Sequence, residues 1–440
     1  MLADSVDPAD TSNAAAAVKD ANGKDTLEPG EYDARSRAVI YYLAEQMQLS
    51  GERVGQLERW IAQQLYFARE SAEASAADSH EESAAEDEEA KAVKKRNKQS
   101  RLLRWTATGT SVIIGAAALG LTGGLAAPML AVGMGALGIA GAHALATAGG
   151  VFLVTSLFGM AGGGLAGYKV ARRTRGLKEF SFTPLADANL PLIPSLHATI
   201  VVPGYLKPGT DAATPWRAPC AAHLADRDVY ALAYDTEVLE ELGRAFREFL
   251  ATEAATFAAG QVLKNTLLAA VMAPLAWPMA LLKAGTLIDN PWGMAIDRAR
   301  KAGHVLADVL QDHVQGHRPI SLIGYSVGAL AIFECLQVMA DRGCHGIIDS
   351  VVLLGAPIED EPERWAKARS VVARRFVNGY ARNDWVLAFL CRVHDAQFKV
   401  AGLQAMDVEG VESVDLEHLI SGHLGYRKQL DAILTHIHAN

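Results

Sequence analysis

The spacing of hydrophobic and polar positions divides this chain of 440 residues into three regions. Between residues 32 and 75, apolar residues recur every three or four positions on both sides of Ser50 and Gly51, which predicts a helical hairpin. Residues 105–168 contain no Lys, Arg, Asp or Glu. From about residue 180, short apolar runs alternate with helical patterns, and this alternation predicts an α/β domain with a mostly parallel, doubly wound sheet.

Five apolar runs in the α/β domain are predicted to be buried strands: 198–202, 228–235, 320–323, 347–355 and 371–379. Helical spacing predicts one helix through Val238, Leu239 and Phe246, and a final helix over 424–436. Residues 251–316 form an insertion whose middle, 267–282, is uncharged and interrupted by Pro274 and Pro278. We expect this insertion to be a lid or a membrane-facing flap, with a buried helix pair as the alternative.

The charge-free region at 105–168 is rich in Gly and Ala, and it is much longer than the ~20 apolar residues that cross a bilayer. We expect two or more transmembrane or re-entrant helices, packed closely through their small residues. Basic clusters at 94–104 and 169–178 flank the region. The positive-inside rule therefore places both ends, and the α/β domain that follows, on the cytoplasmic side. A buried helical hairpin within a soluble protein is the alternative.

Composition outlines the rest of the chain. Residues 1–30 are rich in Ala, Asp, Asn and Gly and are expected to be disordered. Residues 31–104 are the helical region, which ends in a linker that is acidic over 71–89 and basic from residue 91. The α/β domain is expected to occupy 180–440 and to contain the insertion at 251–316.

Charge and cysteine usage narrow the possible functions. A net charge of -9 and a pI near 5.8 argue against nucleic acid as a partner, because binding phosphates requires a basic surface. The four cysteines lie scattered without metal-ligand spacing, which suits a reducing compartment and predicts no metal or cofactor. The N-terminus lacks an apolar core behind a basic start, so we expect no secretory signal there.

The most informative motif is the pentapeptide Gly324-Tyr325-Ser326-Val327-Gly328, which matches G-x-S-x-G. A predicted strand precedes the serine and a predicted helix follows it. The two glycines would let strand and helix approach closely while the serine sits at the apex of a strained turn. We interpret the segment as a nucleophile elbow, with an ordinary Gly/Ser turn of an α/β unit as the alternative.

A serine hydroxyl is a poor nucleophile at neutral pH and needs an adjacent base, normally a histidine oriented by a carboxylate. Asp384 follows the predicted strand at 371–379, and His423 lies on a Gly-flanked loop before the last helix. The order Ser326, Asp384, His423 is the one that this kind of fold requires. Alternatives for the two partners are Asp407 and Asp415 for the acid and His394, His418, His436 and His438 for the base.

The oxyanion that forms during acyl transfer needs two backbone N–H groups aimed at it. One is expected from Val327, directly after the nucleophile. The other is expected from the loop after the strand at 198–202, where Gly204 lets the chain pass close and Tyr205 can donate. Pro203 has no N–H and cannot donate.

Eight motifs together resemble one known family, that of transmembrane and coiled-coil domain-containing protein 4, which shares domain of unknown function 726. They are LTGGLAAP at 121–128, TSLFG at 155–159, GYK at 167–169, WPMALLK at 277–283, IDNPW at 288–292, LIGYSVGA at 322–329, NGYARNDW at 378–385 and SGHL at 421–424. The resemblance covers residue 32 to the C-terminus and implies an α/β-hydrolase fold behind a glycine-rich hydrophobic hairpin. It also implies that Ser326, Asp384 and His423 are the family's triad, and that trafficking adaptors are possible partners, as for a lipase-like fungal relative.

Together, the motifs and the charge-free region predict a membrane-associated serine ester hydrolase, lipase-like, that attacks a lipid or another ester through an acyl-enzyme. Two other classes remain open. The first is a catalytically inactive hydrolase-fold protein that serves as a membrane adaptor in trafficking. The second is a membrane-perturbing secreted toxin that carries the hydrolase as its payload.

Overall fold

The computed structural model describes residues 32–81, 176–186, 193–263, 269–394 and 399–439. The chain divides into two compact units, one of Met1–Tyr32 with Gln63–Leu157 and one of Asp33–Ala62 with Phe158–Asn440. The predicted disorder at 1–30, the basic end of the linker and the hydrophobic region at 105–168 lie outside the described residues. Among the helices that the structure does describe, none has both the length and the apolar character needed to cross a bilayer.

The predicted N-terminal helices are present as α1 (Ala34–Gln46) and α2 (Gly51–Glu81). Asp33 begins α1, because its carboxylate accepts a hydrogen bond from the Ser36 backbone N–H at 2.7 Å and so satisfies one of the free donors of the first turn. The chain leaves the helix after Gln46 and enters α2 at Gly51, which is the predicted break.

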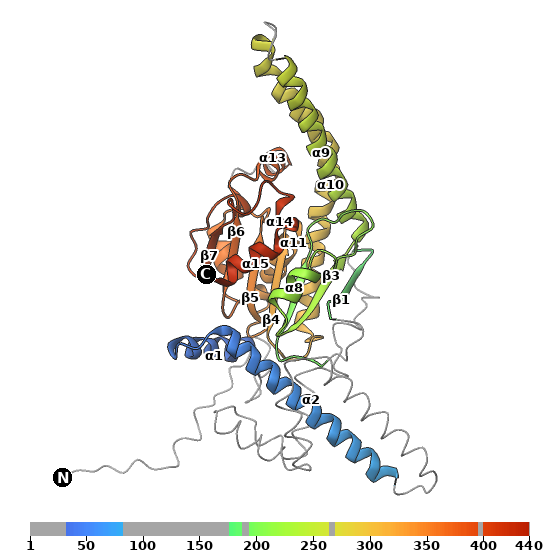
Figure 1. Ribbon diagram of the computed structural model, residues 1–440, viewed down its shortest axis with the longest axis vertical. Coiled ribbons are helices and arrows are strands. Elements are labelled where there is room, and N and C mark those ends of the chain that lie inside the picture. Colours follow the sequence, from blue (N-terminus) through green and yellow to red (C-terminus); the bar gives the residue numbers. More distant parts are fainter. Residues whose placement is uncertain (1–31, 82–175, 187–192, 264–268, 395–398, 440) are drawn as a thin grey trace, which may run out of the picture. The chain divides into compact units, whose positions relative to one another are not determined.

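Within the described residues of the second unit, seven strands form one sheet in the order β1-β3-β2-β4-β5-β6-β7 (Figure 1). β1 pairs antiparallel with β3, and every other pairing is parallel. The strands are β1 (Phe180–Pro184), β2 (Ala198–Val202), β3 (Asp228–Tyr234), β4 (Ile320–Tyr325), β5 (Ile348–Leu354), β6 (Phe376–Tyr380) and β7 (Val411–Asp415).

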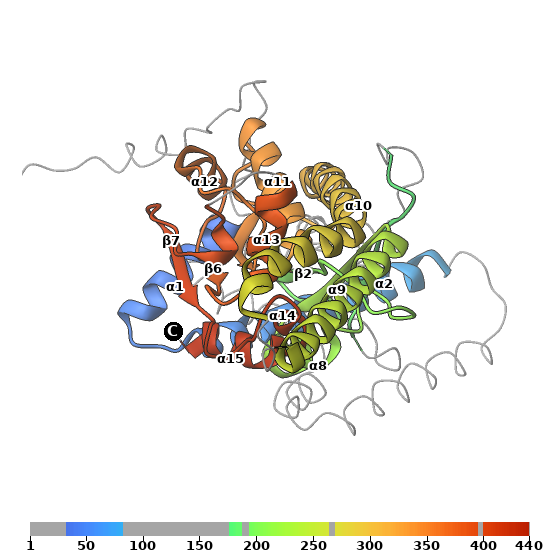
Figure 2. The ribbon, with the colours of Figure 1, turned by 90° about the horizontal axis from the view of Figure 1, so that it is seen from above.

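Helices cover both faces of this sheet, which confirms the predicted doubly wound α/β class. Figure 2 shows α10 (Ala269–Gln311), α11 (Val327–Asp341) and α12 (Pro362–Arg369) on one face, and α8 (Arg217–His223), α14 (Gly425–Lys428) and α15 (Leu430–Ala439) on the other. The insertion at 251–316 contains the end of α9 (Thr236–Leu263) and all of α10, and the two helices pack against each other. The remaining helical segments are α13 (Trp385–His394) and the short η3 (Ala401–Leu403).

The predicted strands differ from the observed ones mainly at the edges. β6 begins at Phe376 rather than at 371, because the chain turns there and the Val372 N–H donates to the Arg369 carbonyl at 3.1 Å. β1 and β7 were not predicted. Both are edge strands whose side chains are only partly buried, so neither carries the continuous apolar run that marks the central strands.

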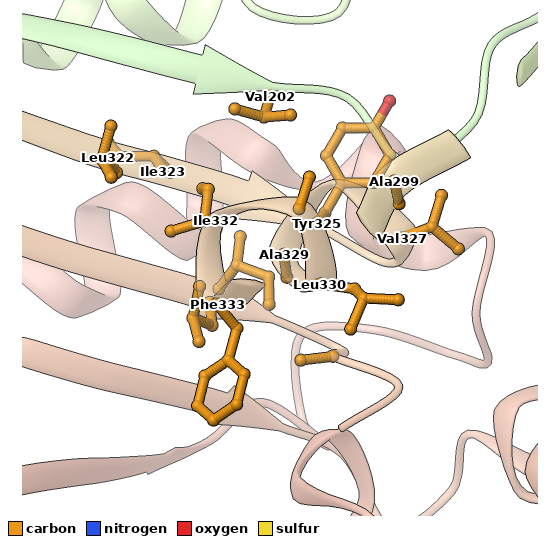
Figure 3. Packing of buried hydrophobic residues seen from close by; sticks show 14 of the residues in the cluster. Val202, Ala299, Leu322, Ile323, Tyr325, Val327, Ala329, Leu330, Ile332 and Phe333 are labelled. Carbon is orange, nitrogen blue, oxygen red and sulfur yellow. The ribbon is translucent and has the colours of Figure 1, made fainter. Parts of the chain in front are cut away.

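The centre of the core lies where β4 runs into α11. All six residues of β4 are buried, as are most residues of α11, and Figure 3 shows their side chains packed against Val202 of β2 and Ala299 of α10. A Cβ at Gly303 of α10 would lie 2.4 Å from the Ala331 carbonyl oxygen, so this glycine is what lets α10 approach α11 so closely. The strand–turn–helix unit is therefore fixed on both sides by packing. With its parallel sheet and central elbow, this is the predicted α/β-hydrolase fold.

A cluster of buried charges lies at the amino ends of the central strands. The fully buried Arg37 of α1 donates to Asp349 of β5 at 2.7 Å and to Glu58 of α2 at 2.8 Å. Arg374 donates to the same Asp349 oxygen at 2.9 Å. Burial alone would raise the pKa of Asp349, but Arg37 and Arg374 outweigh it and hold the pKa of this carboxyl below its usual range. The cluster joins α1 and the start of α2 to the sheet.

Candidate active site

Ser326 stands at the turn between β4 and α11 with a positive φ of 56° and a ψ of -131°. A non-glycine residue in this region is strained and persists only where its surroundings hold it. Here the Ser326 N–H donates to the Leu354 carbonyl at 2.8 Å, and the Ser326 carbonyl accepts from the Ala329 N–H at 3.0 Å. The strain is therefore held by β5 on one side and by the first turn of α11 on the other.

The two glycines of the motif are sterically required. A Cβ at Gly324 would lie 2.9 Å from the Gly328 carbonyl oxygen, and a Cβ at Gly328 would lie 2.4 Å from the Val202 carbonyl oxygen. Neither separation is possible for real carbon atoms, so strand and helix can pack at this distance only with glycine at both positions. The sequence therefore builds the sharp turn that the pentapeptide predicted.

The structure brings the three predicted catalytic side chains together. Ser326 Oγ lies 2.6 Å from His423 Nε2, and His423 Nδ1 lies 2.7 Å from Asp384 Oδ2. All three residues are buried, with 0–1% of their surface exposed. The two nitrogens of one imidazole thus connect a hydroxyl to a carboxylate, which is the arrangement in which the histidine can take the serine proton.

The fold places Asp384 and His423 at the carboxyl ends of the strands, where Ser326 also lies. Asp384 follows β6, and its second oxygen accepts the Leu387 N–H at 3.1 Å, so the start of α13 fixes the carboxylate. His423 lies on the loop between β7 and α14, after Gly422 with φ +72°.

The alternative partners lie elsewhere or are engaged with other groups. Asp415 accepts from the Glu417 N–H at 2.9 Å and pairs with Arg382. The His418 ring packs on that of His436, with 4.9 Å between the centroids. Within the described part of the chain, Asp407 and His438 make no hydrogen bond to Ser326 or His423, and the His394 side chain lies outside that part.

Aromatic rings enclose His423 on several sides. The Phe246 ring of α9 meets the imidazole edge to face at 5.2 Å, and the rings of Tyr205 and Tyr426 lie at 6.0 Å. Trp292 of α10 packs in turn on Phe246 at 6.2 Å. Residues of α9 and α10 therefore close the site from above the sheet edge, and a substrate can reach Ser326 only after some of these side chains move.

The predicted oxyanion residues surround the nucleophile. A Cβ at Gly204 would lie 2.6 Å from the Ser326 Cβ and 2.8 Å from the Val327 nitrogen, so the loop after β2 runs directly against the elbow. The Tyr205 hydroxyl donates to the His423 carbonyl at 3.2 Å, which ties the same loop to the histidine loop. Burial raises the pKa of Tyr205 well above its usual range, so this hydroxyl stays protonated and can donate.

One group of buried polar residues was missed by the sequence reasoning. His197 Nε2 lies 2.9 Å from Ser321 Oγ, and Ser321 donates to Asp349 at 3.3 Å, at the opposite ends of the strands from Ser326. Burial, together with the Arg37 charge, holds the pKa of His197 well below its usual range, so the imidazole is neutral. No local motif marks these residues, because they come from three different strands or strand starts.

Comparison with known proteins places these features in context. The family described as "Protein of unknown function (DUF726)" matches residues 100–440. A protein of Oryza sativa subsp. japonica named transmembrane and coiled-coil domain-containing protein STS1 is 35% identical over 425 residues, covering 93% of this chain and 61% of the rice protein. An uncharacterized membrane protein of Schizosaccharomyces pombe is 35% identical over 424 residues, covering 93% of this chain and 69% of that protein.

A Saccharomyces cerevisiae protein named probable lipase MIL1 is 36% identical over 271 residues, covering 61% of this chain and 24% of the yeast protein. The chain thus spans about three fifths of the rice protein and about a quarter of the yeast protein. The solved structure of an esterase from Thermogutta terrifontis aligns with 61% of this chain and 90% of the esterase chain, at 11% sequence identity and a TM-score of 0.27.

Proposed function

This chain belongs to the DUF726 family, as its motifs predicted, and from that premise we propose that it is a serine ester hydrolase that acts at a membrane. The single observation that carries the proposal is the continuous hydrogen-bonded path from Ser326 through His423 to Asp384 at the apex of a strained elbow. A serine in an ordinary turn has no need of a positive φ together with a buried imidazole whose second nitrogen bonds a buried carboxylate.

In the proposed acylation step, Ser326 Oγ attacks the ester carbonyl carbon while its proton moves to His423 Nε2. The carbonyl electron pair moves onto the oxygen, and the resulting oxyanion is stabilised by backbone N–H groups of Val327 and of the Gly204–Tyr205 loop. Collapse of this intermediate breaks the carbon–oxygen bond to the leaving alcohol, which receives the proton from His423. Asp384 stabilises the imidazolium and keeps Nδ1 protonated.

Water then reverses the sequence. His423 Nε2 takes a proton from the water molecule, whose oxygen attacks the acyl carbon. Collapse of this second intermediate breaks the bond to Ser326 Oγ, His423 returns the proton to Oγ, and the acyl group leaves as a carboxylic acid. No step in this cycle requires a metal or an organic cofactor.

Three observations support a lipid as the substrate class. The charge-free region at 105–168 is long enough to enter a bilayer, and relatives from rice and fission yeast carry transmembrane or membrane-protein names. The budding yeast relative is named a probable lipase. Aromatic side chains, including Phe246 and Trp292, surround the histidine, and such surroundings favour an acyl chain over a charged substrate.

The proposal is tested with the full-length protein in detergent micelles and in phosphatidylcholine vesicles. Hydrolysis of short-chain and long-chain p-nitrophenyl esters and of the vesicle lipid is compared between the wild type, Ser326→Ala and Ser321→Ala. We expect turnover by the wild type and by Ser321→Ala, and loss of turnover in Ser326→Ala. Equal rates for wild type and Ser326→Ala would refute the proposal.

One observation favours a second function. Because Ser326, His423 and Asp384 are enclosed, the described conformation gives a substrate no path to the hydroxyl. A protein that keeps this closed state would act as a membrane adaptor with a hydrolase fold and no turnover. Absence of turnover in micelles and vesicles, with intact membrane binding by the full-length protein, would favour the adaptor.

A further inference from the structure

Two buried tyrosine hydroxyls form hydrogen bonds to the loop at 203–206, which lies against the nucleophile. The Tyr325 hydroxyl donates to the Tyr205 carbonyl at 2.8 Å, and the Tyr234 hydroxyl donates to the Pro203 carbonyl at 3.0 Å. Both tyrosines are fully buried. Burial raises the pKa of each, so both phenols keep their protons and remain donors. The two side chains come from the carboxyl ends of β3 and β4, the strands on either side of β2.

These bonds leave one peptide of the loop uncommitted. The peptide before Gly204 is held through the Pro203 carbonyl. The peptide after Tyr205 is held twice, through the Tyr205 carbonyl and through the Leu206 N–H, which donates to Leu239 of α9 at 2.9 Å. Within the part of the chain that the structure describes, the Gly204 and Tyr205 N–H groups have no backbone acceptor. Because the peptides on both sides are held, the Gly204–Tyr205 peptide can change direction only by rotation about the two single bonds that flank it.

The uncommitted peptide is also the part of the loop that lies closest to the elbow. A Cβ at Gly204 would lie 2.0 Å from the Tyr325 carbonyl oxygen and 2.8 Å from the Val327 nitrogen. Val327 is the first residue of α11, so its N–H precedes the intrahelical hydrogen bonds. Free backbone donors from two different segments therefore meet beside Ser326.

We propose that Tyr325 and Tyr234 are positioning residues for the hydrolysis, because their hydroxyls hold the loop carbonyls so that an N–H of the Gly204–Tyr205 segment points at the forming oxyanion. Tyr325 has a second part in this, since it directly precedes Ser326 and so ties the loop to the nucleophile itself. This inference rests on the proposed hydrolase function. It adds two residues whose hydroxyls act on the loop backbone and not on the side chains of the triad.

Preorganised donors act on the transition state more than on the bound substrate, and losing one whole donor costs about 10²- to 10³-fold in kcat. Loosening a donor without removing it should cost less. We therefore expect Tyr325→Phe and Tyr234→Phe each to lower kcat about 10- to 100-fold with KM nearly unchanged.

The matched control is Tyr230→Phe. Tyr230 is also a buried tyrosine of β3, but its hydroxyl interacts with Arg318 at the far end of the sheet. Loss of that hydroxyl should affect folding alone and leave kcat per folded molecule unchanged.

The experiment measures kcat and KM for a soluble p-nitrophenyl ester, the pH profile of kcat/KM, and the Ki of a trifluoromethyl ketone that forms a tetrahedral adduct with serine. In both Phe variants we expect lower kcat, an increase in Ki of similar size, and an unmoved pH profile. Hydrogen exchange of the peptide spanning 203–207 should become faster in the same variants.

Several results would overturn the inference. They are unchanged kcat and Ki in folded Tyr325→Phe and Tyr234→Phe, an equal loss in Tyr230→Phe, or a shift of the pH profile, which would mean that the hydroxyls act through His423. If one Phe variant does not fold, the other single variant decides. Absence of turnover in the wild type is a different outcome, because it contradicts the proposed function. Whether the tyrosine hydroxyls hold the loop is measured separately, by the hydrogen exchange of 203–207.

Discussion

Two buried groups of serine, histidine and aspartate lie at opposite ends of the strands of one sheet, and β4 contributes to both. At its carboxyl end, Ser326, His423 and Asp384 form a linear path, with each imidazole nitrogen engaged by a different partner. At its amino end, His197 uses the same nitrogen towards Ser321, at 2.9 Å, and towards Asp349, at 3.9 Å.

The remaining contacts separate the two groups further. His197 Nδ1 has no hydrogen-bond partner among the described residues, so no group orients that imidazole as Asp384 orients His423. Asp349 is surrounded by Arg37 and Arg374, whereas Asp384 accepts from the backbone N–H of Leu387. The same three residue types therefore form two different hydrogen-bond networks, a linear one at Ser326 and one joined to arginines at Asp349. The difference lies in which nitrogen meets which oxygen and in whether cations neutralise the carboxylate.

The largest expected effect comes from exchanging each carboxylate for an amide. Asp384→Asn should lower kcat about 10⁴-fold, because the amide stabilises the wrong tautomer of His423. Asp349→Asn should leave kcat per folded molecule unchanged and lower stability instead, because Arg37 and Arg374 lose their buried counter-charge. Ester turnover and urea unfolding of both variants check this pair. A large fall in kcat for Asp349→Asn would break the distinction.

Removal of Arg37, the buried cation of the charge cluster, tests the group at the amino ends of the strands alone. Arg37→Met should lower the free energy of unfolding by about 3–5 kcal/mol, because it removes the buried cation that bonds both Asp349 and Glu58. Arg35→Met is the matched control on the same helix. Its side chain is 47% exposed in a pair with Asp33, so the loss there should stay below about 1 kcal/mol. Equal urea midpoints for the two variants would contradict the account of the charge cluster.

The pH dependence of stability reports on His197. Its pKa is lowered in the folded protein, so the unfolded chain binds a proton that the native state excludes, and stability falls as the pH drops below the unfolded value. Between pH 7 and pH 5.5 this single group should remove about 1 kcal/mol of unfolding free energy, given an unfolded pKa of about 6.5. In His197→Gln the loss over this interval should shrink by that amount. An unchanged slope of stability against pH would show that other groups are responsible.

The smallest effect concerns the strain at the elbow. Ser326→Gly relieves the positive φ, whereas Ser326→Ala keeps it, so the glycine variant should be the more stable of the two by about 1 kcal/mol after its greater chain entropy is counted. Ser321→Gly and Ser321→Ala should show the opposite order, because Ser321 lies in an ordinary strand position. Thermal unfolding of the four variants measures both differences, and the same order at both serines would argue against strain at Ser326.

The group of Ser326, Asp384 and His423 could be predicted from the sequence because its sequence signals are local. Gly324 and Gly328 surround Ser326 within five positions, and the fold fixes the order in which Asp384 and His423 follow. The observed distances agree with the predicted set, although the catalytic roles themselves stay a prediction. The central strands were predictable for a similar reason, since each is a short apolar run buried on both faces.

The buried group at the amino ends of the strands, around Arg37 and Asp349, could not be predicted in the same way. Arg37 and Asp349 are separated by 312 positions, and neither lies in a recognisable motif. The hydroxyl contacts of Tyr234 and Tyr325 are equally invisible, because a buried tyrosine reads as one more apolar residue of a strand. Edge strands β1 and β7 escaped prediction because half-buried strands lack a clear apolar run. Long-range polar pairing is thus what the sequence pattern leaves undetermined.

The most direct test of the central claim is the position of a covalent adduct. Full-length protein in phosphatidylcholine vesicles is treated with a fluorophosphonate and digested, and the modified peptide is identified by mass spectrometry. We expect the phosphonyl group on Ser326, no adduct on Ser321, and loss of labelling in His423→Ala. An adduct on Ser321, or no adduct on Ser326 under conditions in which the wild type is folded and membrane-bound, would contradict the account.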